Sequence, residues 1–588
     1  MMEAAFDLES RIASRLPVRF STIFRVISFL LVLGFLALLA FSLWTLDRGF
    51  DITDESYSLL LAMYPKTYEV FVSAAHWMTS SLWRGAQSLY AFRATGLVIL
   101  ILGASILAWG VLRAANVCDL ALGVGQGSRW AVMAATFAAA LHWLTYGASV
   151  FFTPSYNLLA TAGSYAAVGF ALLGCGDRIN PKRFSFRLLA GASLAVILLS
   201  KFPAGINVTV LTLLLIQICS SSTRERLVGT LLTVTGMAAA TLLVMLTQMM
   251  PVEAAENFRL GLKYYGVGSQ ERADMRIIRY AREFLDHIGG TAIQFAVPVL
   301  FFATYAVVRY RWLAIFGVAV LLARLVSGGY VLGGWPQLSA QVDSLVALAV
   351  LVVLTTIPVW RRTLKSVVLA VGLLTLPYCI SLGTSNALPP QILVSLGSWG
   401  SLFALLAFSK AAVEKAMVVP AVLCTIFVAV ISSQVITSAF SPSYHMDYPL
   451  AEQTVPVKIG AIGTIRVDEK MERFFTVLTD AAERCAIQPG RAFLGFYNIP
   501  GVALVIQAVP VLTPWLVEYE QARPWLDTAP KDILSSAVVG LRLSPDGGTP
   551  RLGAMLPDFP ENYQFCGEAT FPYQDQRIQL WAPRAERL

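Results

Sequence analysis

The sequence predicts an α-helical polytopic membrane protein that carries an α/β domain at its C-terminal end. Composition is the first reason: of 588 residues, 56% are hydrophobic and only 14% are charged. Mean hydropathy is +0.66, whereas soluble chains carry about 25% charged residues. A soluble protein of this size could not bury so much apolar surface, because the buried fraction rises slowly with length. An ordinary soluble enzyme and a disordered chain are therefore excluded.

Apolar segments are the second reason, because a hydrocarbon core about 30 Å thick needs roughly 20 apolar residues in a helix. The sequence has thirteen such segments, at about 23–44, 94–112, 130–150, 156–175, 188–202, 205–219, 227–250, 290–308, 313–330, 338–359, 366–382, 392–408 and 416–437. The fifth and sixth are short, so either is expected to be a broken or tilted helix. The first is expected to be a retained span, since no A-x-A-like cleavage site follows its long apolar run.

The distribution of charge is the third reason, and it predicts the orientation. With the N-terminus inside, seven short cytoplasmic segments hold 18 Lys and Arg residues, as the positive-inside rule requires. From about residue 438 onward the chain has 13 basic and 17 acidic residues, a net charge of −4, which leaves +12 for the rest. We therefore expect an integral protein of the plasma (inner) membrane with a cytoplasmic N-terminus. The balance does not indicate binding of nucleic acid.

The chain is expected to divide into a transmembrane domain, residues 1–437, and an extracytoplasmic or periplasmic α/β domain, residues 438–588. Two further large outside segments lie at about 46–93 and 251–289. Around residues 270–288, apolar and charged residues alternate with helical spacing, which predicts an amphipathic helix at the membrane interface.

The C-terminal domain shows a mixed pattern. Residues 468–485 have helical spacing, and residues 491–497 are typical of a strand that ends at a Pro500-Gly501 turn. Cys485 and Cys566 are its two cysteines, and an oxidising exterior favours a disulfide between them. Two buried free thiols are the alternative.

Four carboxylates follow the first span within nine residues: Asp47, Asp51, Asp54 and Glu55. A long apolar and aromatic stretch comes next and is expected to lie along the membrane interface, which would place the acids between water and lipid. The alternative is structural. Thr53 or Asp54 would simply cap a helix, and acids near a helix N-terminus suit its dipole.

The run Asp54-Glu55-x-Tyr57 at this place resembles the first external loop of GT-C glycosyltransferases, most of all the protein O-mannosyltransferases and the lipid A aminoarabinose transferases. The resemblance covers the layout of residues 1–437 and implies a GT-C-like fold with about 13 transmembrane helices. Several relatives have another acid in the next external loop, but here that loop, residues 152–157, has none. The oligosaccharyltransferase signature WWDYG is absent.

The resemblance implies transfer of a sugar from a polyprenyl-phosphate donor to a glycolipid, a cell-envelope polysaccharide or a protein, with inversion at the anomeric carbon. Such a reaction needs a base for the acceptor hydroxyl and charge stabilisation for the departing phosphate. Asp54 fits the base by resemblance, Glu55 would orient it or contact the sugar, and Asp51 is the competing candidate.

Basic residues near the outside ends of spans are candidates for the phosphate. Lys201 and Arg324 interrupt apolar segments there, where charges are costly and often functional, although their head groups could simply reach the interface. Further candidates for the donor phosphate or lipid are Lys66, Arg84, Arg93, Arg259 and Lys263. Candidates for contact with the sugar or the acceptor are Tyr57, Tyr264, Asn386 and Gln337. His142, within a span, is expected to be a hydrogen-bonded core residue.

No cofactor is expected, because the sequence has no Gly-rich loop that would cradle phosphates and no spacing typical of zinc. A divalent cation among Asp47, Asp51 and Glu55 stays open. Two other functions remain as alternatives. A transporter or lipid flippase predicts acids in the middle of spans, and a non-catalytic scaffold that binds envelope polymer predicts that Asp54→Asn is harmless.

Overall fold

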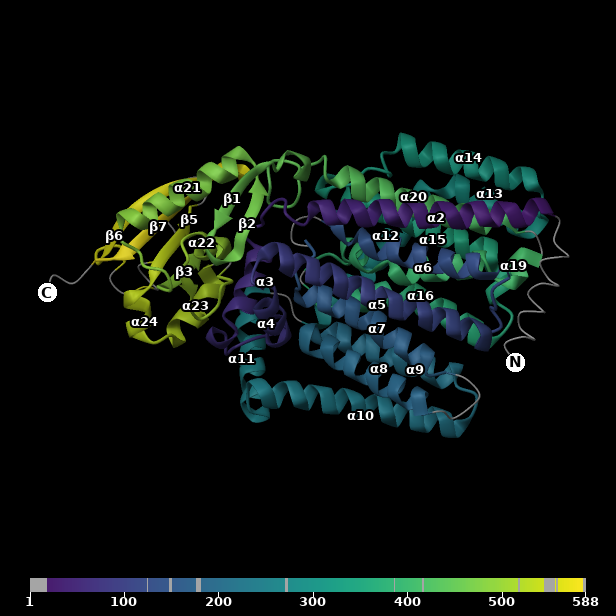
Figure 1. Cartoon of the computed structure of the whole chain (residues 1–588), viewed down its shortest axis with the longest axis horizontal. Coiled ribbons are helices and arrows are strands. Elements are labelled where there is room, and N and C mark those ends of the chain that lie inside the picture. Colours follow the sequence, from purple (N-terminus) through teal and green to yellow (C-terminus); the bar gives the residue numbers. More distant parts are fainter. Residues whose placement is uncertain are drawn as a thin grey trace.

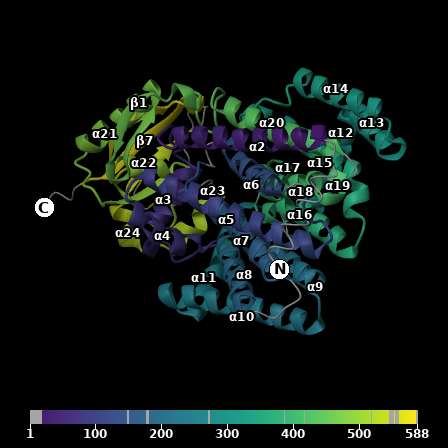
Figure 2. The same cartoon turned by 45° about the vertical axis from the view of Figure 1, so that its right-hand side comes forward.

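The structure is a computed structural model with two parts, a bundle of long helices and an α/β domain beside one end of it (Figure 1). It describes residues 18–123, 125–146, 151–175, 181–269, 273–384, 386–414, 417–516, 519–543, 552, 556 and 559–584. Between the two parts lie α3 (Asp54–Met63), α4 (Ala75–Ala86) and α11 (Pro251–Ser269). Turning the molecule by 45° leaves this arrangement in place (Figure 2).

Within the described residues, nine helices are long and apolar enough to cross a membrane. They are α2 (Val18–Thr45), α5 (Leu89–Val117), α7 (Tyr156–Leu173), α8 (Pro181–Ser200), α9 (Phe202–Cys219), α10 (Thr223–Gln248), α15 (Leu338–Trp360), α16 (Leu364–Ser381) and α20 (Val418–Ser438). Two bent pairs raise the number to eleven if each pair is one span. The predicted α-helical membrane protein with a C-terminal α/β domain is confirmed, but the count of thirteen spans is not.

The remaining predicted spans are helical but short or broken. One bent pair joins α12 (Ala273–Gln294) to α13 (Ala296–Val308) at 81°, and the other joins residues 388–395 to α18 (Gly397–Ala407) at 64°. Two more helices, α6 (Gly125–Leu141) and α14 (Arg311–Ser327), have 17 residues each.

The breaks do not fall in the fifth and sixth predicted spans, which form the helices α8 and α9. The α8 helix begins at Pro181, before the predicted start at 188, because its first turns are polar and basic and do not register as apolar. The bend after α12 is attributed to a proline. Pro298 has no N–H to bond the carbonyl of Gln294, and the Arg324 side chain donates to that carbonyl instead, at 3.2 Å.

The helices of the bundle pack closely where small residues face each other. On α5 and α7, Gly110 lies against Gly169, and a Cβ added to Gly110 would come within 2.3 Å of the Gly169 carbonyl oxygen. Such small-residue contacts bring the backbones of membrane helices together. His142 is a hydrogen-bonded core residue, as predicted. Its ring nitrogens lie 3.0 Å from the Leu393 carbonyl and 2.8 Å from the Gln434 side-chain oxygen.

The C-terminal α/β domain is built on a five-stranded sheet in the order β4-β3-β5-β7-β6. The strands are β3 (Ala492–Phe496), β4 (Val509–Pro510), β5 (Val538–Arg542), β6 (Tyr563–Phe571) and β7 (Gln576–Pro583). The strand β3 is parallel to β4 and β5, whereas β7 is antiparallel to β5 and β6. A separate hairpin consists of β1 (Val455–Ile459) and β2 (Gly463–Val467).

Helices cover the sheet. The predicted helix is α21 (Glu469–Arg484), and the face with Met471, Phe474, Phe475 and Leu478 is buried, as its spacing predicts. The expected turn at Pro500-Gly501 is wrong. These residues begin α22 (Pro500–Val505), because proline is well suited to the first turn of a helix. Two more helices, α23 (Tyr519–Thr528) and α24 (Lys531–Ser536), lie between β4 and β5 in the chain.

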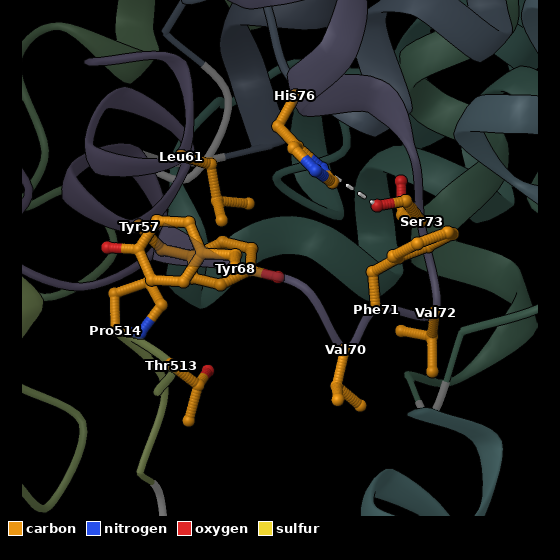
Figure 3. Close-up of a pocket in the computed structure, with 10 residues that line it drawn as sticks. All are labelled: Tyr57, Leu61, Tyr68, Val70, Phe71, Val72, Ser73, His76, Thr513 and Pro514. Atoms are coloured by element: carbon orange, nitrogen blue, oxygen red, sulfur yellow. Dashed lines mark hydrogen bonds between the residues drawn. The ribbon is translucent and has the colours of Figure 1, made fainter. Parts of the chain in front are cut away.

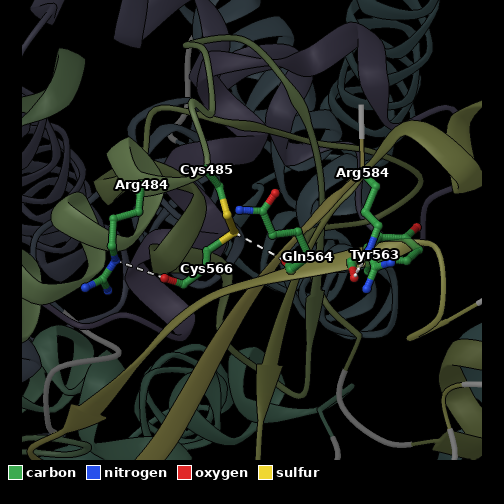
Figure 4. The surroundings of a disulfide bond; sticks show 6 residues. All are labelled: Arg484, Cys485, Tyr563, Gln564, Cys566 and Arg584. Carbon is green, nitrogen blue, oxygen red and sulfur yellow. Dashed lines mark hydrogen bonds between the residues drawn. A yellow bond between two sulfur atoms is a disulfide. The ribbon is translucent and has the colours of Figure 1, made fainter. Parts of the chain in front are cut away.

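A disulfide bond joins Cys485, which follows α21, to Cys566 in β6 (Figure 4). Next to it, the Arg484 side chain donates a hydrogen bond to the Cys566 carbonyl at 3.1 Å. The helix that covers the sheet is therefore attached to the edge strand by a covalent bond and by a hydrogen bond.

The domain binds directly to the segment that connects α2 to α5 (residues 46–88). Arg466 of β2 receives a hydrogen bond from the Gly49 N–H at 2.8 Å and donates its own N–H to Asp47 at 2.7 Å. Its side chain also pairs with the Asp47 carboxylate at 3.0 Å. From α22, the Gly501 N–H donates to the Ile52 carbonyl at 2.8 Å.

This contact corrects the expectation that the apolar residues after Glu55 lie along the membrane interface. Leu59 and Leu60 are fully buried in one hydrophobic cluster with Phe475 and Val502 of the domain. The physical reason is that the domain offers them an apolar surface, so they are removed from water by protein instead of by lipid.

The close approach of α22 to this segment gives a testable prediction. A Cβ at Gly501 would lie 2.7 Å from the Ile52 Cα and from the Ser56 Oγ. We therefore expect Gly501→Val to destabilise the protein by about 1–3 kcal/mol through overpacking, seen as a lower thermal midpoint in detergent. Gly85→Ala on α4 is the control, because nothing lies within 4 Å of its added Cβ. Equal midpoints for the two variants would contradict this account.

Candidate active site

The acids that follow the first span are held in a tight turn before α3. The Asp51 carboxylate accepts hydrogen bonds from the Thr53 N–H at 2.9 Å, the Thr53 hydroxyl at 2.6 Å and the Glu55 N–H at 3.1 Å. Its side chain is fully buried. Asp51 thus satisfies the free N–H groups at the start of the helix, the role that the structural alternative assigned to Thr53 or Asp54.

A histidine from the C-terminal domain completes this turn. His445 Nδ1 lies 2.7 Å from the Thr53 hydroxyl and 3.8 Å from the Asp51 carboxylate. Since the Thr53 hydroxyl donates to Asp51, its oxygen is available to accept from His445. Burial alone would raise the pKa of Asp51, but its interactions with His445 and Thr53 outweigh burial and lower that pKa below the ordinary value. Asp51 is therefore held ionised.

Glu55 forms a buried ion pair with Arg93 of α5. The Arg93 Nε donates to one carboxylate oxygen at 2.7 Å and a terminal nitrogen donates to the other at 2.6 Å. The other three donors of the guanidinium bind the carbonyls of Leu46, Arg48 and Gly49. All five N–H groups of an arginine are then used, so Arg93 has no donor left for a phosphate.

The next connection between helices supports the same pair. Thr153 donates its hydroxyl to Glu55 at 2.5 Å, and the Phe151 ring lies 3.9 Å from the Arg93 guanidinium carbon. This is the loop that lacks the further acid of the glycosyltransferases. Here it supplies a hydroxyl and an aromatic face to a buried carboxylate.

Asp54, the first residue of α3, has a different environment from its neighbours. Its side chain is partly accessible, and no side chain in the described part of the molecule donates a hydrogen bond to its carboxylate. Burial within the protein and the nearby charge of Asp51 raise the pKa of Asp54 well above the ordinary value. Two carboxylates three residues apart therefore have pKa values shifted in opposite directions, an arrangement found at acid–base sites.

Tyr57 lies one helical turn after Asp54. Its ring packs edge to face against Trp515 of the domain, with the centroids 4.9 Å apart. Tyr57 also lines a small cavity between the α2–α5 segment and the domain, together with His76 and Thr513 (Figure 3). The C-terminal domain therefore contacts the helix that carries Asp54.

Lys201 lies in the short connection between α8 and α9 and is only 5% exposed. Its ammonium group donates to the carbonyls of Ile380 at 2.9 Å and Ser381 at 3.4 Å, at the end of α16. The residue before it, Ser200, accepts a hydrogen bond from the Ser73 hydroxyl at 2.7 Å. Lys201 thus adjoins the α2–α5 segment, which also holds the acids.

The other predicted cations are not joined to the acids by any described contact. Arg324 donates to the Tyr330 hydroxyl at 3.1 Å as well as to Gln294. Arg259 pairs with Glu256 at 2.8 Å on the surface of α11. The remaining ones are exposed, namely Lys66, Arg84 and Lys263.

The predicted sugar or acceptor contacts lie in different places. Tyr264 is buried against Trp525 of α23, with ring centroids 5.1 Å apart. Gln337 ends the short helix η4 (Trp335–Gln337) and is half-buried, and Asn386 is exposed. Of this group, only Tyr57 lines the small cavity between the α2–α5 segment and the domain.

The carboxylates proposed as an alternative cation site each have another partner: Asp47 pairs with Arg466, Asp51 with Thr53 and His445, and Glu55 with Arg93. In the part of the chain that the structure describes, no group of three or more His, Cys, Asp or Glu residues is arranged to hold a metal ion.

The sequence-based reasoning missed three histidines. The chain has only four, and apart from His142 each lies in a different predicted outside segment. His76 is in α4 and lines the cavity, and His445 contacts the acid turn. His287 of α12 pairs with Asp343 of α15 at 3.1 Å. Their rarity in a chain of this length was the available signal.

The sequence matches no protein-family model and no curated protein sequence. The chain is similar to the crystal structure of ArnT from Cupriavidus metallidurans bound to undecaprenyl phosphate, at 13% identity, covering 93% of this chain and 97% of that one, with a TM-score of 0.41. It is also similar to the archaeal oligosaccharyltransferase AglB from Archaeoglobus fulgidus in complex with an inhibitory peptide and a dolichol-phosphate, at 13% identity, covering 87% and 69% of the two chains, with a TM-score of 0.43.

ArnT is a lipid A aminoarabinose transferase, and both proteins are GT-C glycosyltransferases. At such low identities and TM-scores, these likenesses do not decide what this chain binds or does. The functional inference therefore depends on the residues of the site.

The buried ion pair predicts a large loss of stability when one partner is removed. We expect Arg93→Met and Glu55→Met each to lower the free energy of unfolding by about 3–5 kcal/mol, because each leaves an uncompensated buried charge. The double variant should lose less than the sum of the two. Thermal unfolding in detergent measures this, with the exposed Arg84→Met as the control, expected within about 0.5 kcal/mol of wild type. Additive losses would contradict the pairing.

The opposite pKa shifts of the two aspartates predict opposite effects on stability. A carboxyl with a raised pKa in the folded protein contributes stability that is full below its ordinary value of 3.8 and is lost as pH rises through the raised value. Asparagine does not ionise, so Asp54→Asn should raise the thermal midpoint relative to wild type at pH 8 and not at pH 4.

Asp51 has a lowered pKa, so its contribution is present above 3.8 and is lost as pH falls through the lowered value. Asp51→Asn should therefore lower the midpoint at pH 8. Thermal midpoints of both variants between pH 4 and pH 9 test the pair, and shifts of the same sign at pH 8 would show that the assignment is wrong.

Proposed function

We propose that this chain is a membrane glycosyltransferase that moves a sugar from a polyprenyl-phosphate donor to an acceptor hydroxyl, with Asp54 as the general base. The observation that supports it best is the environment of Asp54. Its pKa is raised, its side chain is partly accessible, and no described side chain donates a hydrogen bond to its carboxylate. A base for a hydroxyl needs a pKa closer to the working pH than that of an ordinary aspartate.

The proposed step is a direct displacement. The acceptor oxygen attacks the anomeric carbon while the bond from that carbon to the phosphate oxygen breaks. The electron pair of that bond leaves with the polyprenyl phosphate, and the acceptor proton passes to the Asp54 carboxylate. In-line attack inverts the anomeric centre. No oxidant, nucleotide or cofactor enters the balance, because the lipid phosphate is already a good leaving group.

The neighbours of Asp54 take positioning roles in this proposal. Asp51 holds the turn before α3 and supplies the negative charge that raises the pKa of Asp54. Glu55, which carries the hydrogen bonds of Arg93 and Thr153, fixes the orientation of α3. Glu55 is therefore not assigned a contact with the sugar, and Asp51 is not assigned the base.

Lys201 is the cation that we assign to the donor phosphate. Its ammonium group has three donors, and the carbonyls of Ile380 and Ser381 use two of them. Its place at the end of α8, adjoining the α2–α5 segment, is consistent with contact to a lipid phosphate at the level of the membrane surface. Arg324 is not assigned to the phosphate, because its side chain already donates a hydrogen bond to the Gln294 carbonyl at the bend after α12.

The proposed location is the extracytoplasmic face of the plasma (inner) membrane, with the N-terminus in the cytoplasm. The excess of Lys and Arg in the short loops predicted to be cytoplasmic supports this orientation. The partners would be a polyprenyl-phosphate sugar, membrane lipids and an acceptor that is a glycolipid, an envelope polysaccharide or a protein.

Sugar transfer by the purified protein tests the proposal. With a panel of synthetic polyprenyl-phosphate sugars, we expect wild type to release polyprenyl phosphate. Asp54→Asn should lower the rate by about 10²–10⁴-fold, the usual contribution of a general base, and should keep donor binding. Asp480→Asn, an exposed acid of α21, is the matched control and should be unchanged.

Three results would count against parts of this scheme. A full rate in Asp54→Asn would remove the base. A loss seen only in Asp51→Asn, in protein with a normal thermal midpoint, would move the base to that residue. No binding of any donor by wild type would remove the transferase itself and favour a transporter or a scaffold.

A further inference from the structure

The pair formed by His287 of α12 and Asp343 of α15 has no part in the proposed reaction, yet its acid lies inside an apolar span. That span runs from Trp335 to Trp360. Among the nine described helices that could cross a membrane, only α10 also contains an Asp or a Glu, and its Glu225 lies in the first turn of the helix. Acids inside spans are costly, rare and often functional. The pair is therefore a candidate for a separate role.

The contacts of Asp343 show how its charge is balanced. His287 Nδ1 lies 3.1 Å from the Asp343 carboxylate, and the two side chains are only 10% and 14% exposed. The Thr291 hydroxyl donates to the same carboxylate oxygen at 3.0 Å. An ionised carboxylate only accepts hydrogen bonds, so His287 Nδ1 carries a proton.

The other ring nitrogen of His287 is the place where a second proton can bind. Within the described residues, Nε2 is buried and has no hydrogen-bond partner, so its lone pair is available. A proton added there makes the ring a cation opposite the Asp343 carboxylate. Hydrogen bonds between two charged groups are stronger than those with a neutral donor, and a buried carboxylate without a counter-charge is unfavourable.

Histidine is the side-chain type that ordinarily changes charge between about pH 5 and pH 8, and no other histidine belongs to the helices around this pair. The helix α12 packs against α15 and α17 (Leu388–Ile392), which lie next to it in Figure 2. Apart from Asp343, neither of these two helices has a titratable side chain. The charged or titratable neighbours on other elements are Tyr378 of α16, Tyr305 of α13 and Arg324 of α14.

On α12 itself, the charged residues nearest to His287 are a pair and an exposed acid. Arg279 and Glu283 lie one and two turns before His287 and pair with each other at 3.0 Å. Asp286 is exposed. Of the groups that surround the Asp343 carboxylate, His287 is thus the one whose charge is expected to change in this range.

Polar contacts attach α12 to the bundle at two further points. The Tyr280 hydroxyl donates to the Thr384 carbonyl, and Glu283 accepts a hydrogen bond from the Leu388 N–H at 2.7 Å. Its apolar side chains are largely exposed instead, as expected for a helix at the membrane interface, among them Ile278, Leu285 and Ile293. The attachment of α12 therefore depends strongly on its hydrogen bonds.

We propose that His287 and Asp343 form a proton-binding site that attaches α12 to α15, strongly when the imidazole is charged and more weakly when it is neutral. In the detached state the imidazole would have no carboxylate beside it, so the attached state binds the proton more readily. By linkage, attachment then strengthens as pH falls and weakens as pH rises through the titration of the imidazole. This inference does not depend on the proposed function.

Hydrogen exchange of the full-length protein in detergent tests the proposal at pH 5 and pH 8, with exchange times scaled to the intrinsic chemical rates. We expect backbone amides of residues 280–291 in wild type to exchange about tenfold more slowly at pH 5, the difference between a charged and a neutral hydrogen bond. Amides of α21, a helix without histidine, are the internal reference and should show no corrected difference.

Two variants of the pair and one control identify the group that titrates. His287→Gln keeps a donor for Asp343 but does not titrate in this range, and Asp343→Asn removes the carboxylate. In each variant we expect the pH dependence of residues 280–291 to disappear. Asp286→Asn is the matched control, because it removes an exposed acid beside His287, and it should keep the wild-type pH dependence.

Three results would overturn the proposal: equal corrected exchange of residues 280–291 at the two pH values in wild type, slower exchange at pH 8, or a pH dependence that persists in His287→Gln. The first two need only wild type, so they decide the matter even if a variant does not fold. Because no turnover is measured, a failure of the proposed sugar transfer would leave this result unaffected.

Discussion

The buried pair of Arg93 and Glu55 is the interaction on which the arrangement of the site depends. A buried ion pair is favourable only when the remaining polar atoms are satisfied as well. Here the guanidinium gathers three carbonyls between Leu46 and Gly49 besides the carboxylate. The end of the first span, the start of α3 and the start of α5 are consequently held at one point.

The orientation of Asp54 follows from that pair. Successive residues of a helix point about 100° apart, so a carboxylate turned inward at Glu55 leaves its neighbour facing another direction. The carboxylate of Asp51, one turn earlier, is also occupied, because it accepts the hydrogen bonds of the turn that it caps. Of the three acids at this turn, only Asp54 is left to act on something outside the protein. Division of roles among adjacent carboxylates by environment is a general device of acid–base sites.

Much of the fold followed from the sequence because hydropathy is a local and additive property. Each predicted apolar segment contains helix, and the apolar face of α21 was read correctly from its spacing. The bend before α13 was not predicted, since it depends on a carbonyl freed by Pro298 and bound by Arg324 from another helix.

The site was predicted only as a group of candidates. Asp51, Asp54 and Glu55 could not be ranked, because their roles are set by partners far away in the chain. Thr53 and His445 are separated by 392 residues, and Glu55 and Arg93 by 38. The apolar residues after Glu55 were assigned to lipid for the same reason, since nothing local reveals that the domain covers them.

The contact between β2 and residues 47–49 has a consequence for how the domain and the membrane helices can move and diverge. Backbone hydrogen bonds run directly between the two, so a rotation of the domain would drag the acid turn with it. The domain and the end of the first span are therefore expected to move together as one body. It follows that this domain is not a module that recombination could exchange freely. A replacement domain would have to keep three contacts with the acid turn: the backbone hydrogen bonds of Arg466, the close approach at Gly501 and the hydrogen bond of His445. Without them, the turn that orients Asp54 would lose its support.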